Sequence, residues 1–302
     1  MTKVWMIGIL VLLALASCRK EEVVFEDNTA PAYTGVPTVQ VNNYVNRLFI
    51  DLIGREPLDA EMALEVDSLE AGGLSMATRT SLVSRLMSST AYVEGDSSYR
   101  HAYFFKVYND LKARMIEGAS EGILTARYNQ LYSQSIADSL NGDYEAMQRN
   151  RQAANRIAMV QSSGTDLRLA TATLREVHAR MCHNAIYDEI NMGSFNFVNA
   201  TFSDLFDRFP TAEEFDNAYQ IIEFNEAAVV FGTAAQNKGE YLDILVNAPE
   251  FDEGLVRYAY RSLVSREPSS LEVFEALNNV NGNLTLGAVQ LPVLISDEYA
   301  GF

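Results

Sequence analysis

The sequence predicts an all-α protein. Beyond about residue 40, apolar residues recur at the three- and four-residue spacing of amphipathic helices, whereas the alternation typical of strands is rare and short. Serine, threonine and proline residues separate one helical stretch from the next. One helix-forming segment also occurs three times. We therefore expect three helical-hairpin units, interrupted by an insertion of four helices and preceded by a flexible N-terminal tether.

The first 17 residues have the features of a bacterial secretory signal. Lys3 is followed by an uncharged apolar run over residues 4–16, which is too short to span a bilayer as a helix. The run ends in Leu15-Ala16-Ser17-Cys18, which resembles the lipobox of bacterial lipoproteins. We therefore expect residues 1–17 to be removed and Cys18 to carry lipid, because two or three acyl chains anchor a protein firmly. An ordinary secretory signal with a chance cysteine is the alternative.

The residues after Cys18 predict the location of the protein. Lys20, Glu21 and Glu22 resemble the export tag that sends Bacteroidetes lipoproteins to the outer face of the outer membrane. We therefore expect a lipid anchor in the outer membrane and display at the cell surface, with the periplasmic leaflet as the alternative. Residues 18–40 are polar, contain two prolines and have no helical apolar period, which predicts a flexible tether.

The net negative charge of the chain disfavours some classes of partner. Without residues 1–17 the chain has 22 Lys and Arg against 40 Asp and Glu, a net charge of −18. Such an acidic surface repels nucleic acid and anionic headgroups, so we expect no nucleic-acid partner. The charge is explained by solubility alone, and a cationic partner or divalent ions are the alternatives.

A helical segment of constant length recurs three times, at residues 44–57, 197–210 and 255–268. Each copy has one apolar stripe and ends in arginine, any residue and proline, and the proline disfavours further helix. The arginine and proline positions are Arg55 and Pro57, Arg208 and Pro210, and Arg266 and Pro268. We expect each arginine to bind helix-terminal carbonyls or the glutamate six residues later, which is Glu61, Glu214 or Glu272. A shared binding surface is the alternative.

Each copy begins a longer unit, and we expect the units to span residues 41–95, 194–253 and 254–302. Capping boxes at Thr211 and Ser269 predict a second helix directly after the proline, whereas Leu58 occupies the cap position of the first unit. Each unit closes with an aromatic residue, at Tyr92, Phe251 or Tyr299.

The insertion, residues 96–193, predicts four helices. A turn is expected at Asn141-Gly142-Asp143, and a break at residues 162–165, where two serines, a glycine and a threonine are adjacent. A long helix is then expected over about residues 166–191, capped by Thr165 or Asp166.

The repeated segment resembles two groups of helical domains. Leu52-Ile53-Gly54-Arg55-Glu56-Pro57 resembles the phycobilisome-linker-like repeat of bacterial surface proteins, as does Arg266-Glu267-Pro268. The close Ser296-Asp297-Glu298-Tyr299 and the proline turn also resemble the cytochrome-associated domain of planctomycete-type proteins. The resemblance implies a helical module used for surface attachment or assembly, and it carries over no catalytic residue.

The side chains with metal-binding or catalytic chemistry are few. His178 and Cys182 lie four residues apart and would share a helix face, whereas His183 would turn away. We expect core residues here and not a metal or haem site, and we predict no cofactor. The adjacent acids at 188–189 and 213–214 are expected to be solvated. The sequence contains no phosphate-binding loop and no zinc-protease motif, and we assign no catalytic residue.

These observations predict a non-catalytic binding or assembly component of the cell envelope, with a protein partner there. The first alternative is a periplasmic accessory lipoprotein of an envelope complex, including a redox complex. The second is a hydrolase whose carboxylates come from distant segments. Ser68 and Ser139, each between aspartate and leucine, resemble Bacteroidetes O-glycosylation acceptors, so we expect glycan at these two serines.

Overall fold

The computed structural model describes residues 35–279 and 285–302. Helices make up almost all of the regular structure there, and the strands form one short hairpin, which confirms the all-α prediction. The contacts of Pro37–Phe302 group these residues into one compact unit. The predicted signal peptide and most of the predicted tether lie outside the described residues.

The first predicted unit contains α2 (Thr38–Leu48), the π-helix η1 (Phe49–Ile53), α3 (Asp59–Ala71) and α4 (Met76–Ser88). Since α2 begins at Thr38, the prediction that the tether extends to residue 40 is wrong in its last three residues. The apolar stripe of the repeat is buried on α2 and η1, where Val45, Leu48 and Leu52 are fully covered.

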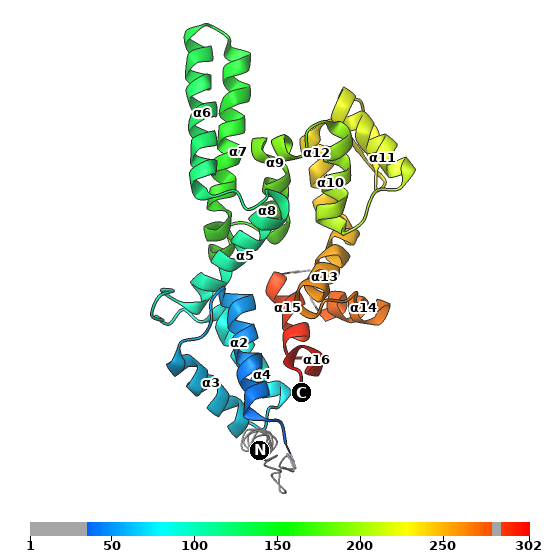
Figure 1. Ribbon diagram of the computed structural model, residues 1–302. Coiled ribbons are helices and arrows are strands. Elements are labelled where there is room, and N and C mark those ends of the chain that lie inside the picture. Colours follow the sequence, from blue (N-terminus) through cyan, green and yellow to red (C-terminus); the bar gives the residue numbers. More distant parts are fainter. Residues whose placement is uncertain (1–34, 280–284) are drawn as a thin grey trace, which may run out of the picture. The chain divides into compact units, whose positions relative to one another are not determined.

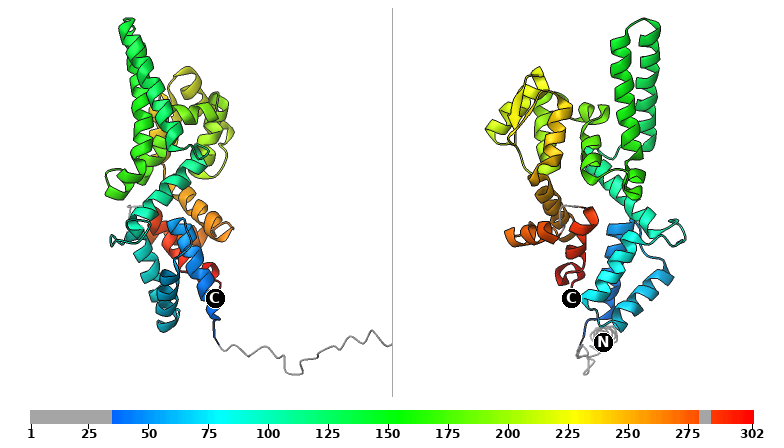
Figure 2. Two further views of the ribbon diagram at one scale, coloured as in Figure 1. Left: turned by 60° about the vertical axis from the view of Figure 1, so that its left-hand side comes forward. Right: turned by 180° about the vertical axis from the view of Figure 1, so that it is seen from behind.

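The insertion forms five helices and not the predicted four: α5 (Tyr99–Met115), α6 (Glu121–Leu140), α7 (Tyr144–Leu169), α8 (Leu174–Cys182) and α9 (Ala185–Ile190). The predicted turn at residues 141–143 joins α6 to α7, and these two long helices lie antiparallel (Figures 1 and 2).

The predicted break at residues 162–165 is wrong, because α7 continues through it. The hydroxyls of Ser162 and Ser163 donate to the carbonyl of Met159 and stay within the helix. Gly164 lies against Tyr108 of α5, so this glycine allows close helix packing and does not end the helix.

The long helix predicted over residues 166–191 is also wrong. α7 ends where Ala170 takes the left-handed conformation, with φ of 56°. Thr173 and Glu176 then form a capping box that starts α8, and the Asn184 side chain starts α9 by accepting two backbone N–H groups. Asp166 is not a cap, because its carboxylate accepts hydrogen bonds from Ser162 and Arg180.

The described C-terminal part contains eight further helices and the hairpin. They are α10 (Ser194–Phe206), α11 (Ala212–Tyr219), the π-helix η2 (Gln220–Phe224), β1 (Ala228–Val230), β2 (Thr233–Ala235), α12 (Lys238–Asn247), α13 (Pro249–Val264), α14 (Ser270–Asn279), α15 (Leu286–Leu294) and α16 (Asp297–Ala300). The predicted boundary between residues 253 and 254 falls inside α13, which belongs to both neighbouring units.

The hairpin was not predicted from the sequence. β1 and β2 pair antiparallel, with Ala228 opposite Ala235 and Val230 opposite Thr233. Phe231 and Gly232 between them both have positive φ, which is the geometry of a tight hairpin turn.

The first and third predicted units pack directly on each other. The Tyr44 hydroxyl donates to the Leu294 carbonyl at 3.1 Å, and the Tyr299 hydroxyl donates to Asp51 at 2.7 Å. The guanidinium of Arg47 lies 4.0 Å from the centre of the Tyr299 ring and donates to the carbonyls of Tyr299 and Leu263. Helices distant in sequence therefore share one hydrophobic core.

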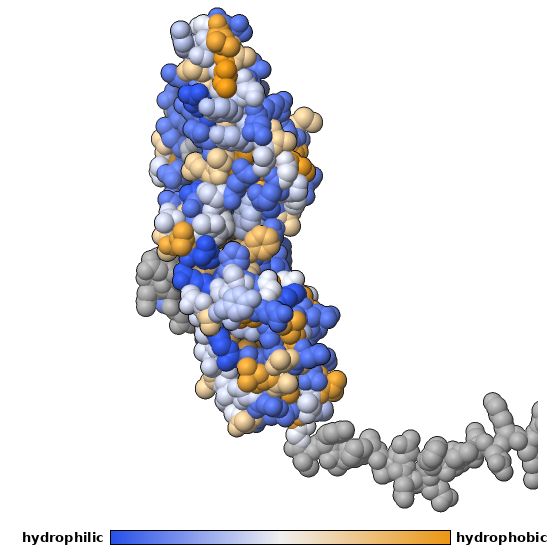
Figure 3. Space-filling model, turned by 90° about the vertical axis from the view of Figure 1, so that its left-hand side faces the viewer, coloured by the Kyte–Doolittle hydropathy of each residue, from blue (hydrophilic) through white to orange (hydrophobic). Residues whose placement is uncertain are grey.

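The surface is largely polar on the face drawn in Figure 3, where hydrophobic residues form small separate areas. Among the described residues, no helix is both long enough and apolar enough to cross a membrane.

Candidate functional site

The three repeated arginines follow helix ends of the same geometry. The residue before each arginine has a left-handed conformation: Gly54 has φ of 86°, Asp207 has φ of 60° and Ser265 has φ of 57°. This residue ends η1, α10 or α13 and turns the chain out of the helix. Pro57, Pro210 and Pro268 lie between these arginines and the next helix, as the repeat predicts.

Arg208 shows the contacts that these positions share. Its Nη1 and Nη2 donate to the two carboxylate oxygens of Glu214 at 2.8 and 2.7 Å, and Nη1 also donates to the carbonyl of Phe209 at 2.9 Å. Its Nε and Nη2 donate to Glu250 at 2.5 and 2.8 Å. Every N–H of the guanidinium therefore has a partner.

The other two arginines have equivalent partners. Arg55 contacts Glu61, the Glu56 carbonyl and Asp96. Arg266 contacts Glu272, the Glu267 carbonyl and Glu298. Each arginine thus pairs with the glutamate six residues later, and also with an acid that the sequence analysis did not identify. We call each of these three groups an arginine clamp.

The glutamate of each clamp also starts the next helix. Glu214 accepts the backbone N–H of Thr211 at 2.7 Å, and Glu272 accepts that of Ser269 at 2.6 Å. The hydrogen bonds from Arg208, which outweigh partial burial, and then the N–H of Thr211 lower the pKa of Glu214 to about 2. Arg266 and Ser269 lower the pKa of Glu272 to about 2 in the same way. Each clamp therefore joins one helix end to the next helix start, which is a structural task.

The second acid of each clamp connects the end of a unit to the turn after its first helix. Glu250 and Glu298 each precede the closing aromatic residue, Phe251 or Tyr299, which is buried. For the first unit the acid is Asp96, one residue beyond the predicted end of the unit, and the buried aromatic residue is Tyr99 of α5, which packs edge-on against Phe49. The predicted closing residue Tyr92 is 80% exposed, so that assignment is wrong.

The histidine and cysteine cluster lies in the core. His178 is 1% exposed, its Nδ1 is 2.8 Å from the Leu174 carbonyl, and burial lowers its pKa to about 4. Cys182 is fully buried, and burial, followed by the nearby Asp204, raises its pKa well above the usual value. A thiol held protonated in this way is a poor nucleophile and a poor metal ligand. Within the described residues, no three His, Cys, Asp or Glu side chains are grouped to hold a metal.

The remaining predicted residues are dispersed. Ser68 is exposed in the last turn of α3, and Ser139 is half-buried in the last turn of α6. The acids at 188 and 189 are exposed, as predicted, and they also form ion pairs with Lys238 and Arg127. The same prediction holds for the exposed Glu213 and fails for Glu214, which belongs to a clamp. Cys18, Lys20, Glu21 and Glu22 lie outside the described residues.

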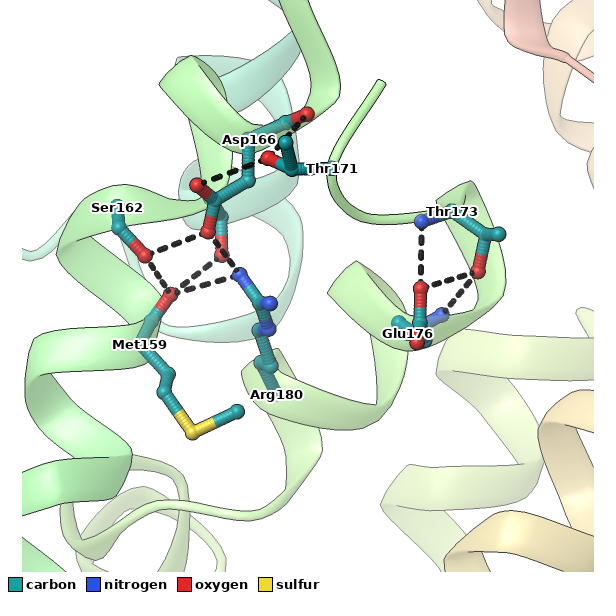
Figure 4. Close-up of polar contacts among 8 residues, drawn as sticks. Met159, Ser162, Asp166, Thr171, Thr173, Glu176 and Arg180 are labelled. Carbon is teal, nitrogen blue, oxygen red and sulfur yellow. Dashed lines mark hydrogen bonds and ion pairs between the residues drawn. The ribbon is translucent and has the colours of Figure 1, made fainter. Parts of the chain in front are cut away.

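A cavity of about 290 Å³ lies between α7 and α8. Arg156 and Met159 line it from α7, and Glu176, Ala179, Arg180 and His183 line it from the α8 side. Figure 4 shows the polar contacts beside this cavity: Arg180 reaches Asp166 and the Met159 carbonyl, and Glu176 folds back onto Thr173. The sequence analysis did not identify this cavity, because its walls come from two helices that were assigned wrongly.

A row of aromatic rings crosses α10, α11 and η2. Phe195 meets Phe215 with ring centres 5.1 Å apart, Phe215 stacks on Tyr219 at 5.8 Å, and Tyr219 meets Phe224 at 5.9 Å. Phe195 is 62% exposed and Phe224 is 59% exposed. We call these four residues the aromatic row.

Acidic side chains border the aromatic row. Glu213, Asp216, Glu223 and Glu226 are all exposed, and none of them forms an ion pair with a described residue. The row therefore combines an apolar surface with uncompensated negative charge. No protein-family model, curated protein or solved structure matches this chain.

Proposed function

We propose that this protein is a non-catalytic binding or assembly component of the cell envelope. In this proposal, lipid on Cys18 anchors it to the outer membrane at the cell surface, and the aromatic row docks a protein partner. The observation that carries the proposal is the aromatic row itself. Phe195 and Phe224 are exposed while Phe215 and Tyr219 are half-buried, and aromatic side chains gathered at a surface are typical of interaction sites.

The exposed acidic side chains beside the aromatic row favour a partner with positive charge. Glu213, Asp216 and Glu226 would remain uncompensated beside a neutral partner, and an acidic partner would be repelled. A partner that fits presents an apolar or aromatic anchor flanked by lysine or arginine. Phe195 and Phe224 supply exposed rings for the anchor, since aromatic side chains dominate the energetics of most interfaces.

Photo-crosslinking in intact cells of the native host tests this proposal. A photoreactive amino acid replaces Phe224, and the matched control carries it at Phe274 of α14, which is 64% exposed. We expect position 224 to attach to one discrete protein, in a peptide that contains lysine or arginine near the attached residue. Glu213→Gln together with Asp216→Gln should lower the yield, because the charge attraction is reduced.

The other occupants of the row give different outcomes. Attachment to lipid would assign the row to a membrane surface, and attachment to a second copy of this chain would assign it to self-assembly. Either result, or the same products at positions 224 and 274, would contradict docking of a basic partner.

Location is tested separately from docking. Cys18→Ala should release the protein from the membrane fraction, and a variant that stays bound through a high-salt wash would contradict the lipid anchor. Protease added to intact cells should digest the wild type, whereas Lys20→Ala combined with Glu21→Gln and Glu22→Gln should protect the protein. Equal protection of both proteins would place the wild type in the periplasm.

The two proposed glycosylation sites are tested by intact-mass measurement on protein from its native host. Ser68→Ala and Ser139→Ala should each remove the mass of one glycan. A wild-type mass explained by polypeptide and lipid alone would contradict glycosylation.

A further inference from the structure

The cavity between α7 and α8 is built along the seam of two helices. Arg156 and Met159 are three residues apart on α7, and the α8 side contributes positions 176, 179, 180 and 183. These spacings place the lining residues on the two facing helix surfaces. A volume of about 290 Å³ accommodates a small organic molecule, and Met159 and Ala179 are the apolar residues of its lining.

Two of the four polar residues that line the cavity are committed to the protein. Glu176 accepts the N–H and the hydroxyl of Thr173 at 2.6 and 2.9 Å, which fixes its carboxylate at the start of α8. Arg180 donates to Asp166 at 2.7 Å and to the carbonyl of Met159 (Figure 4). Their charges are therefore used within the protein.

The other two polar residues have unused hydrogen-bonding capacity. Arg156 is half-buried, and its guanidinium forms no ion pair or hydrogen bond with the described residues. The ring of His183 likewise forms no hydrogen bond with them. Arg156 therefore differs from Arg180 across the cavity, whose guanidinium is paired with Asp166. An unpaired guanidinium over an apolar floor is complementary to a planar anion that has an apolar body.

We propose that this cavity binds a small organic carboxylate. The carboxylate accepts two parallel hydrogen bonds from Arg156, and its apolar body lies on Met159 and Ala179. His183 completes the site as a second hydrogen-bonding group. This inference is independent of the proposed docking surface, which lies on other helices.

The protonation of His183 couples to binding. Burial, followed by the charges of Arg156 and Lys238, lowers the pKa of His183 to about 4, so it is neutral at pH 7. Arg180 and Glu176 on α8 are committed as described, and Lys238 on α12 pairs with Asp188 of α9 at 2.5 Å. A carboxylate in the cavity offsets the charge of Arg156, so it should raise the pKa of His183 by about 1 pH unit.

Ligand titrations on the full chain, purified in detergent, test this proposal. The probes are benzoate, its neutral analogue benzamide and inorganic phosphate, and binding is followed by calorimetry. We expect benzoate to bind with Kd of about 1 mM or tighter, and benzamide and phosphate to bind at least tenfold more weakly. Arg156→Gln should weaken benzoate binding about tenfold or more, the usual loss for one charged hydrogen-bonded contact. Arg149→Gln, two turns away on α7 and exposed, is the matched control and should leave binding unchanged.

A second readout requires no substitution at the site. The ring protons of His183, assigned by comparison with His183→Gln, should titrate at higher pH in the presence of benzoate. Benzamide or phosphate binding as tight as benzoate, equal binding by Arg156→Gln and the wild type, or an unchanged His183 titration would each overturn the assignment.

Discussion

Replacing Arg208 by methionine tests whether the arginine clamps are structural. Methionine keeps a long apolar side chain against Phe202 and Phe206, which the guanidinium now overlies at 5.2 and 5.9 Å from the ring centres. The substitution therefore removes the charge and the hydrogen bonds while leaving much of the packing in place.

The expected cost follows from what the guanidinium contacts. It donates to both oxygens of Glu214, both oxygens of Glu250 and one carbonyl. Without it, two carboxylates that are 19% and 25% exposed lose their counter-charge and most of their donors. A fully buried pair broken in this way costs about 3–5 kcal/mol, but solvent reaches this cluster, and exposed pairs contribute about 1 kcal/mol or less. We expect Arg208→Met to lower the free energy of unfolding by about 2 kcal/mol, between these limits.

Thermal unfolding followed by circular dichroism measures this loss. For a protein of this size, about 2 kcal/mol corresponds to a decrease in Tm of about 4–8 °C. The loss should also depend on pH. The pKa of Glu214 is about 2 in the folded protein and about 4.3 in an unfolded chain. A lowered carboxylate pKa contributes stability above the unfolded pKa and loses it as the pH falls, so the difference between variant and wild type should shrink from pH 5 toward pH 2.

Two results would refute this reasoning. Equal Tm values for Arg208→Met and the wild type at pH 6 would show that the clamp contributes no stability, and a shared binding surface would then explain the recurring arginine better. A difference in Tm that stays constant down to pH 2.5 would show that the ion pair is not its source. Arg149→Met, at an exposed site with a long contact of 3.8 Å to Glu145, is the control and should leave Tm unchanged.

Three other substitutions have expected directions in the same thermal assay. Leu58→Thr should raise stability by about 1 kcal/mol, because α3 begins without a side-chain oxygen at its cap; no gain would show that Glu61 alone suffices there. Ser265→Gly should raise stability by about 0.5–1 kcal/mol, since φ is 57° at this position; a loss would mean that the hydroxyl has a role. Tyr44→Phe should lower stability by about 1 kcal/mol, because it leaves the buried Leu294 carbonyl without its donor; an unchanged Tm would contradict the contribution of this contact between the first and third units.

The local part of each clamp was predictable because it depends on short sequence distances. An arginine before a proline and a glutamate six residues later are forced close together by the turn between two helices, and the observed Arg208–Glu214 contacts follow directly. Glu250 was not predictable in this way, because it is 42 residues from Arg208 and reaches it through the tertiary fold. Glu250 and Glu298 share a signal in the sequence, because each directly precedes the closing aromatic residue of its unit. The first unit has no acid at the equivalent position, and Arg55 pairs with Asp96 instead.

The errors in the insertion have one physical cause. Serine, glycine and threonine at residues 162–165 have low helix propensity, and the sequence alone cannot show that packing compensates for it. In the structure, α7 packs along α5 and α6, and the hydroxyls of Ser162 and Ser163 bond within the helix. The observed end of α7, at Ala170, has a weaker signal in the sequence, since alanine rarely adopts a left-handed conformation. The hairpin was missed for a similar reason, because Phe231 is an uncommon residue for its turn.

A substitution at Gly164 tests whether residues 162–165 form a helix break, as the sequence predicts, or a continuous part of α7, as in the structure. If the segment were a flexible break, Gly164→Ala would favour the helix by about 1 kcal/mol. In the structure, a Cβ on Gly164 would lie 3.0 Å from the Cβ and 3.1 Å from the Cγ of Tyr108, which is closer than such atoms normally approach. Tyr108 is 4% exposed, and its hydroxyl donates to Glu121 at 2.8 Å, so it has little room to move.

We therefore expect Gly164→Ala to lower stability by about 1 kcal/mol, because an overpacking cost of about 1–3 kcal/mol exceeds the gain in helix propensity. Gly122→Ala in α6 is the matched control, since the nearest atom to its added Cβ is the Ser120 Oγ at 3.7 Å. The same chemical change should raise stability there by about 0.5 kcal/mol. Urea unfolding of both variants measures the two signs. A stabilising Gly164→Ala would mean that α5 and α7 are not packed closely at this point, and the helix break predicted from the sequence would then be the better description.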